Sequence, residues 1–133
     1  MADGLTLRLR RAADTVPRVR GVVGQELSRH GVQAEIVDRV VLASAEACNN
    51  AILHARGATY RVTIEVGCGD CTVIVADSGS GFDMPDRLVM PEPDAVGSRG
   101  LALMGALVDQ VKVDTSESGT TVILQHALDG QNI

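Results

Sequence analysis

The segment from residue 34 to residue 55 contains neither proline nor glycine. Its apolar residues recur three and four positions apart, which is the spacing of one face of a helix. They are Ile36, Val37, Val40, Val41, Ala45, Cys48 and Ile52. We therefore expect one long helix with a continuous apolar face, and such a face has to be buried against a second layer of the fold.

Shorter patterns surround this helix. Pro17 suits the first turn of a helix over about 16–29, and apolar residues at helical spacing indicate another near 101–108. Strands are expected where apolar and polar residues alternate, or where a short run is wholly apolar. These segments are 5–10, 60–66, 73–76, 111–114 and 120–127. Helices and strands do not alternate as in a βαβ chain, so we predict an α+β fold, with three helices on one face of a mixed, mainly antiparallel sheet.

Length and composition narrow the functional classes. The 133 residues suit one domain over 1–133. A net charge of −5 and an aromatic content of 2% argue against direct binding of nucleic acid, which favours basic surfaces and stacking side chains. No apolar run is long enough for a signal peptide or a membrane span, so we expect a cytoplasmic protein without a membrane partner.

Three cysteines are an odd number, which fits a reducing compartment. Cys68 and Cys71 form a CGDC motif between two strand-like runs, where a hairpin turn is expected. Redox cysteine pairs sit instead at a helix N-terminus, and structural zinc needs four ligands. We therefore favour small apolar side chains beside a turn over a redox or metal site.

Glu46 and Asn50 lie four residues apart in EACNNAILHA (46–55), so they project from the same helix face. An asparagine oxygen suits Mg²⁺, which proteins hold through one or two ligands beside phosphates and water. A glutamate suits a general base that aligns a hydroxyl for attack on a γ-phosphate. A solvated helix face would explain the same two residues, and the pair alone does not decide.

Asp77 follows a wholly apolar strand in DSGSGFD (77–83), where a buried carboxylate needs a partner. The amino group of adenine would serve as that partner. Gly79 and Gly81 allow the backbone to approach a ligand closely. The alternative is a tight turn in which Asp77 only forms the turn.

Two further motifs follow. Arg99 and Gly100 open a helix in SRGLALM (98–104), where free N–H groups and the helix dipole favour a phosphate. Ser98 could equally be no more than the cap of this helix. The sequence GTT (119–121) is the weakest motif, since many hairpins contain it. No GxxxxGK[ST] sequence occurs, which excludes a P-loop.

In this order and at these spacings, the four motifs resemble the N box and the three glycine boxes of the Bergerat fold. This two-layer nucleotide-binding domain is shared by gyrase, heat-shock chaperones, histidine kinases and mismatch-repair ATPases. From residue 5 to residue 128 the chain is similar, more narrowly, to the stand-alone anti-sigma-factor serine kinases of bacteria. The resemblance implies binding of ATP and Mg²⁺ beneath a lid formed by residues 82–98.

The resemblance also implies a role for each matching residue. Asn50 would bind Mg²⁺ and Glu46 would be the catalytic base, while Asp77 would accept a hydrogen bond from the adenine amino group. The remaining nucleotide contacts would come from the glycine boxes: Gly79, Gly81, Ser98, Arg99, Gly100, Leu101, and Thr120 or Thr121. One departure concerns the second box, which often reads Gly-x-Gly in the family, whereas here Ser98 precedes Arg99-Gly100.

A free-standing domain that holds ATP has to act on another protein. The family resemblance implies that it binds a sigma factor, phosphorylates a serine or threonine of an anti-anti-sigma antagonist, and forms a homodimer through its amino-terminal strand. A non-catalytic module that uses ATP only to sequester a protein partner is the alternative. The intact Glu46 favours the kinase, and the altered second glycine box favours the binding module.

Overall fold

The computed structural model describes residues 3–54, 57–77, 99–116 and 119–128. The strands are β1 (Asp3–Arg10), β2 (Thr59–Val66), β3 (Asp70–Asp77), β4 (Gln110–Ser116) and β5 (Gly119–Ala127). The helices are α1 (Val16–Arg29), preceded by the short 3₁₀ turn η1 (Ala13–Thr15), then α2 (Ala34–His54) and α4 (Arg99–Leu107). The segments expected to be helical and extended are confirmed within these ranges.

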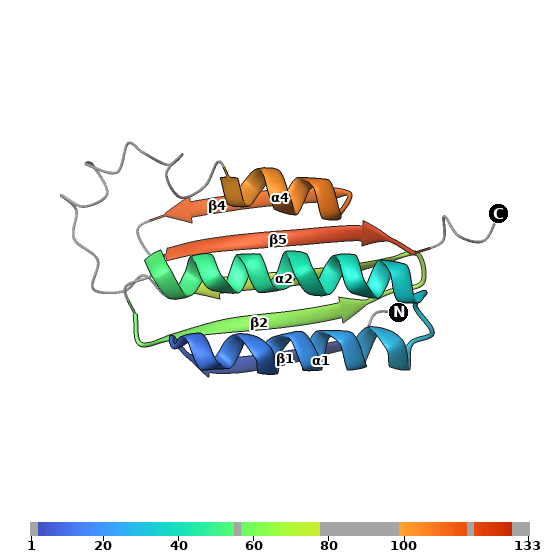
Figure 1. Ribbon diagram of the computed structural model, residues 1–133, viewed down its shortest axis with the longest axis horizontal. Helices are drawn as coiled ribbons and strands as arrows, with labels where there is room; N and C mark the ends of the chain where they lie inside the picture. The colour runs from blue at the N-terminus through green and yellow to red at the C-terminus, as the bar shows by residue number, and fades with distance from the viewer. Residues whose placement is uncertain (1–2, 55–56, 78–98, 117–118, 129–133) are drawn as a thin grey trace.

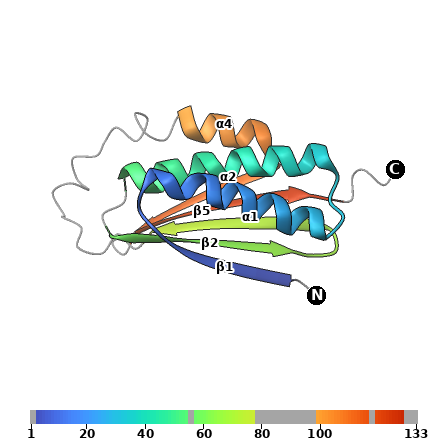
Figure 2. The same ribbon diagram turned by 60° about the horizontal axis from the view of Figure 1, so that its bottom comes forward.

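The strands form one sheet in the order β1-β2-β3-β5-β4, and all four pairings are antiparallel. The parallel pairing that a mixed sheet would include does not occur among the described strands. Figure 1 shows α1, α2 and α4 side by side, and Figure 2 shows that they form one layer over one face of the sheet. The expected α+β fold with three helices on one face is confirmed.

The core lies between these two layers. Alternate residues of the strands point toward the helices, and on β2 and β3 they are fully or nearly fully buried: Tyr60, Val62, Ile64, Val66, Cys71, Val73 and Val75. The stripe on α2 that packs against them is lined by small side chains such as Ala43, Ala47 and Cys48. Because these side chains are short, α2 packs closely on the centre of the sheet.

One end of the molecule gathers segments that are far apart in the sequence. The last turns of α2, the end of β3 at Asp77, the first turn of α4 and the start of β5 all lie at that end, on the left of Figure 1. The expected lid (82–98) lies outside the described residues. Within the described ranges, no helix is long and apolar enough to cross a membrane.

Candidate functional site

Glu46 and Asn50 are half-buried on α2, one turn apart, and both face the first turn of α4. A Cβ atom built on Gly100 would come 2.9 Å from Asn50 Nδ2 and 3.5 Å from Glu46 Oε2. Real Cβ contacts are essentially never as short as the first of these distances. Glycine at position 100 therefore allows the backbone of α4 to lie directly against the two polar side chains.

The two helices run antiparallel along this contact. At its other end, the Arg39 guanidinium of α2 donates to the carbonyl oxygens of Ala106 and Leu107, at 3.3 and 3.5 Å. A cation at the last carbonyls of a helix interacts favourably with the helix dipole. This contact fixes the C-terminal end of α4 while its N-terminal end, where free N–H groups are concentrated, faces Asn50.

Asp77 ends β3 on the face of the sheet that the helices cover. Its Oδ1 accepts a hydrogen bond from the Thr120 amide at 3.2 Å, which joins β3 to the first residues of β5. Its other carboxylate oxygen has no hydrogen bond to the described parts of the chain. Burial raises the pKa of the Asp77 carboxyl, and the Thr120 amide and the charge of Arg11 partly oppose this rise. One acceptor therefore remains for a ligand in a partly desolvated place.

A buried hydrogen-bond network lies next to Asp77. Tyr60 is the cross-strand neighbour of Asp77 on β2, and its hydroxyl lies 2.6 Å from Thr15 Oγ1, which donates to the Ala12 carbonyl at 2.7 Å. The Cys48 thiol of α2 also contacts Tyr60. Burial is the main cause that raises the pKa of both Cys48 and Tyr60 to about 12. Both groups are therefore neutral at ordinary pH, and they join η1, α2 and β2 beneath the site.

Comparison with known families agrees with this arrangement. Residues 9–126 match the family described as the histidine kinase-like ATPase domain. The chain belongs to this family.

Named proteins of similar sequence are kinases and anti-sigma factors. The chain is 30% identical to the serine-protein kinase RsbW of Bacillus velezensis, over 98% of this chain and 89% of that protein. It is 29% identical to the protein of the same name from Bacillus subtilis, over 99% and 90%. It is 28% identical to the anti-sigma F factor of Clostridium acetobutylicum, over 68% and 70%.

Two solved structures share the fold. The structure of the RsbU and RsbW domains of a Mycobacterium tuberculosis protein superposes with a TM-score of 0.73 at 22% identity, over 95% of this chain and 32% of that one. The histidine kinase domain of a blue-light activated kinase from Erythrobacter litoralis gives a TM-score of 0.58 at 21% identity, over 90% and 62%. The two-layer histidine kinase-like ATPase fold is thus confirmed.

Within this histidine kinase-like ATPase domain, the structure places several of the predicted site residues. Glu46, Asn50 and Gly100 come together, and Asp77 meets Thr120 at the same end of the sheet. Thr121 pairs with Ala76, on the sheet face opposite the helices, whereas Thr120 lies on the covered face. Of the two alternatives in GTT, Thr120 is therefore the better placed.

The structure describes only some of the other predicted site residues. Arg99 begins α4, and Leu101 in its first turn is 38% exposed. Three predicted contacts, Gly79, Gly81 and Ser98, lie outside the described residues.

The CGDC segment spans the expected turn between β2 and β3 and the first two residues of β3. Cys68 is exposed, whereas Cys71 is buried and faces the core. Burial is the main cause that raises the pKa of the Cys71 thiol to about 11, so it is not activated for redox chemistry. No group of three or more potential metal ligands occurs among the described His, Cys, Asp and Glu residues.

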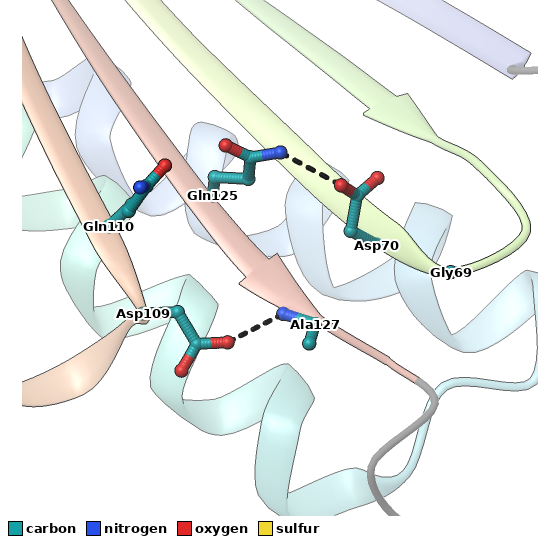
Figure 3. Close-up of a pocket in the computed structure, with 6 residues that line it drawn as sticks. All are labelled: Gly69, Asp70, Asp109, Gln110, Gln125 and Ala127. Carbon is teal, nitrogen blue, oxygen red and sulfur yellow. Dashed lines mark hydrogen bonds between the residues drawn. The ribbon is translucent and has the colours of Figure 1, made fainter.

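The far end of the sheet carries an open hollow of about 420 Å³ between β3, β5 and the start of β4 (Figure 3). Gln125 donates to Asp70 there, and the Ala127 amide donates to Asp109, both at 2.8 Å. Because the hydrogen bonds join neighbouring strands, they stabilise the end of the sheet. Asp70 begins the strand that Asp77 ends, so this hollow is separate from the candidate site.

Proposed function

We propose that this protein is an ATP-dependent serine/threonine kinase that sequesters a sigma factor and phosphorylates an anti-anti-sigma antagonist. The observation that carries the proposal is the contact of Gly100 with Asn50 and Glu46, at the end of the sheet where one carboxylate oxygen of Asp77 has no hydrogen bond to the described residues. The similarity to serine-protein kinases and to an anti-sigma factor over most of the chain supports the choice of acceptor and partner.

The residues present fit Mg²⁺ and ATP. Gly100 allows the first turn of α4 to lie against Asn50 and Glu46, and the first turn of a helix has free N–H groups of the kind that bind phosphates. Asn50 would hold Mg²⁺ through its side-chain oxygen, and the metal, when bound, would neutralise charge on the phosphates. Asp77 would select adenine by accepting from its amino group.

The proposed reaction uses few residues of this chain. Glu46 would accept the proton of the serine or threonine hydroxyl as its oxygen attacks the γ-phosphorus, while the bond to the β,γ-bridging oxygen breaks and ADP leaves. Asn50, one turn away, would hold the metal that neutralises charge on the phosphates. The first turn of α4, which begins at Arg99, would orient the phosphates through its amides.

The assay for the kinase is single-turnover phosphate transfer from labelled ATP to candidate antagonists encoded near its gene. Glu46→Gln should lower the transfer rate by about 100- to 10,000-fold and leave nucleotide affinity nearly unchanged, because proton acceptance is lost while shape is kept. Asn50→Ala should weaken both. Glu35→Gln and Asn49→Ala are matched controls, because both residues are exposed on the same helix.

The outcomes separate the two functions. Full transfer by Glu46→Gln would remove this residue from the mechanism. An absence of transfer by the wild type to every candidate, with tight ATP binding, would favour the non-catalytic sequestration module.

Asp77→Asn tests the adenine contact. The variant should bind ATP less tightly, by about 1–3 kcal/mol, because an amide presents a donor or a weaker acceptor to the amino group. Wild type should prefer ATP to GTP, since guanine carries a carbonyl where adenine carries this amine. Calorimetry that finds equal affinities for ATP and GTP in the wild type would contradict the assignment.

We also propose a homodimer and a cytoplasmic location. β1 is eight residues long, forms an edge of the sheet and leaves Leu5 36% exposed. Edge strands with free hydrogen-bonding groups pair readily with another chain. The pairing of two β1 strands would cover this edge.

A further inference from the structure

Arg11 follows β1 directly, yet its side chain reaches the helix that carries Glu46 and Asn50. Its Nε donates to the Gly57 carbonyl at 2.7 Å, and its Nη1 donates to the Ile52 carbonyl in the last turn of α2. Its own amide donates to the Ala58 carbonyl at 2.9 Å. Three hydrogen bonds from one residue thus join the end of β1 to the end of α2 and to the entrance of β2.

The positive charge of the same guanidinium lowers the pKa of the Asp77 carboxyl. The two residues are connected through a short path across the sheet, because Ala58 leads into β2, where Tyr60 is paired with Asp77. Arg11 is half-buried, so water screens its charge less than that of an arginine on the surface. Arg11 therefore links both halves of the candidate site, the metal-binding helix and the adenine acceptor.

We infer that Arg11 is a positioning residue of the nucleotide site, which fixes the last turn of α2 and holds Asp77 as an anionic acceptor for adenine. This inference rests on the proposed function for the identity of the ligand. Arg11 does not touch the nucleotide in this scheme. It acts through Asp77 and through the helix that presents Asn50.

The inference has a definite pH signature. Asp77 accepts from adenine when ionised, so binding is strong above the pKa of its carboxyl and is lost as the pH falls through that value. The positive charge of Arg11 lowers this pKa, against the rise caused by burial. Without that charge the pKa is higher, and the loss of binding begins at a higher pH.

The titration of other ionisable groups has to be distinguished from that of Asp77. Tyr60 and, behind it, Cys48 stay neutral over the range of the assay, because their pKa values are about 12. The charge of Asp14 in η1 further raises the pKa of Tyr60. His54 ends α2 and is exposed, so the titrations are made in a His54→Gln background.

The test measures the dissociation constant of Mg·ATP against pH for wild type, Arg11→Gln and Arg11→Lys. Arg11→Gln should move the midpoint upward, because a positive charge that lowers the pKa of Asp77 is lost, and it should weaken binding most below the midpoint. Arg11→Lys keeps the charge but not the fork of donors, so it should weaken binding equally at all pH values. The phosphates titrate alike in all variants, so their contribution cancels.

Arg10→Gln is the matched control. Arg10 is the preceding residue, and it pairs at 3.3 Å with Asp14, where both side chains are 71% exposed. It should leave the midpoint unchanged. A purely structural role of Arg11 would weaken binding equally at all pH values in the glutamine variant as well, and that result would overturn the inference.

A second measurement does not depend on the nucleotide. The carboxyl carbon resonance of Asp77, followed against pH without ligand, should titrate at a higher pH in Arg11→Gln than in wild type. Arg11→Met, which keeps the aliphatic stem, replaces the glutamine variant if that variant does not fold. If wild type binds no adenine nucleotide, the proposed function fails, but this resonance still reports whether Arg11 controls Asp77. An unchanged titration of Asp77 in Arg11→Gln would overturn this inference but not the proposed function.

Discussion

Replacing Gly100 by alanine should damage the site and leave the fold nearly intact. The new Cβ would meet Asn50 Nδ2 at 2.9 Å, so the asparagine side chain has to rotate away. A side chain displaced from its preferred rotamer costs about 0.5–1.5 kcal/mol, whereas alanine is favoured over glycine inside a helix by up to about 1 kcal/mol. The two terms nearly cancel, and the free energy of unfolding should change by less than about 1 kcal/mol.

The effect on ligand binding should be much larger. Rotation of Asn50 moves its oxygen from the proposed metal position, and contacts to charged groups are worth about 1.5–3 kcal/mol, or roughly 10- to 150-fold in Kd. Calorimetry with Mg·ATP measures this loss, and urea unfolding measures stability. Gly105→Ala is the matched control on α4, because a Cβ there would meet nothing within 4 Å. It should leave binding unchanged and stabilise the helix.

The reasoning would be refuted if Gly100→Ala bound Mg·ATP as tightly as wild type. It would also be refuted if the variant lost several kcal/mol of stability, because the close approach would then be needed for folding rather than for the site. A similar loss of binding in Gly105→Ala would show that α4 as a whole, and not the contact with Asn50, governs affinity.

Three further predictions concern the rest of the chain. Tyr60→Phe should lower the free energy of unfolding by about 1–3 kcal/mol in chemical denaturation, because Thr15 loses a buried partner; an unchanged midpoint would contradict this. Only Cys68 should react quickly with a thiol reagent in the folded protein, since the other two thiols are buried, and fast reaction of all three would argue against this core. Light scattering should give a dimer that Leu5→Lys weakens; a monomeric wild type would contradict the edge pairing.

Much of the fold was predictable because its signals are local. The absence of proline and glycine over 34–55 and the apolar spacing there fix α2, which spans Ala34–His54. Strict alternation fixes β2, and its partner β3 follows after a turn of few residues. Periodicity of this kind reports which face of each element is buried, so the two layers could be inferred without coordinates.

The candidate site was predictable only where motifs carry it. Glu46 and Asn50 are four residues apart, so their common direction follows from helix geometry alone. The contact of Gly100 with these residues joins segments about fifty positions apart. The family resemblance implied only that these segments belong to one nucleotide site, and the contact itself was not predicted. Folding in three dimensions also separates Thr120 from Thr121, which the sequence left as alternatives.

The supporting residues were missed. Arg11 lies close in the sequence to two other arginines, Arg8 and Arg10, and no motif includes it. The bonds to Ile52 and Gly57 span more than forty residues and leave no periodic pattern. One signal was available: Arg11 is the first residue after the alternating strand, so its side chain is not committed to either face of the sheet.

The last strand in the sequence, β5, lies between β3 and β4 in the sheet, so the sheet is completed by the last part of the described chain to be synthesised. Synthesis up to residue 77 supplies both long helices and three neighbouring strands, but a domain generally folds as a unit, and the sheet is not complete without β5. Asp77 meets its amide partner only after residue 120 has been made. The proposed pocket for adenine is therefore complete only after nearly the whole chain has been made, and ATP bound there would stabilise only such chains.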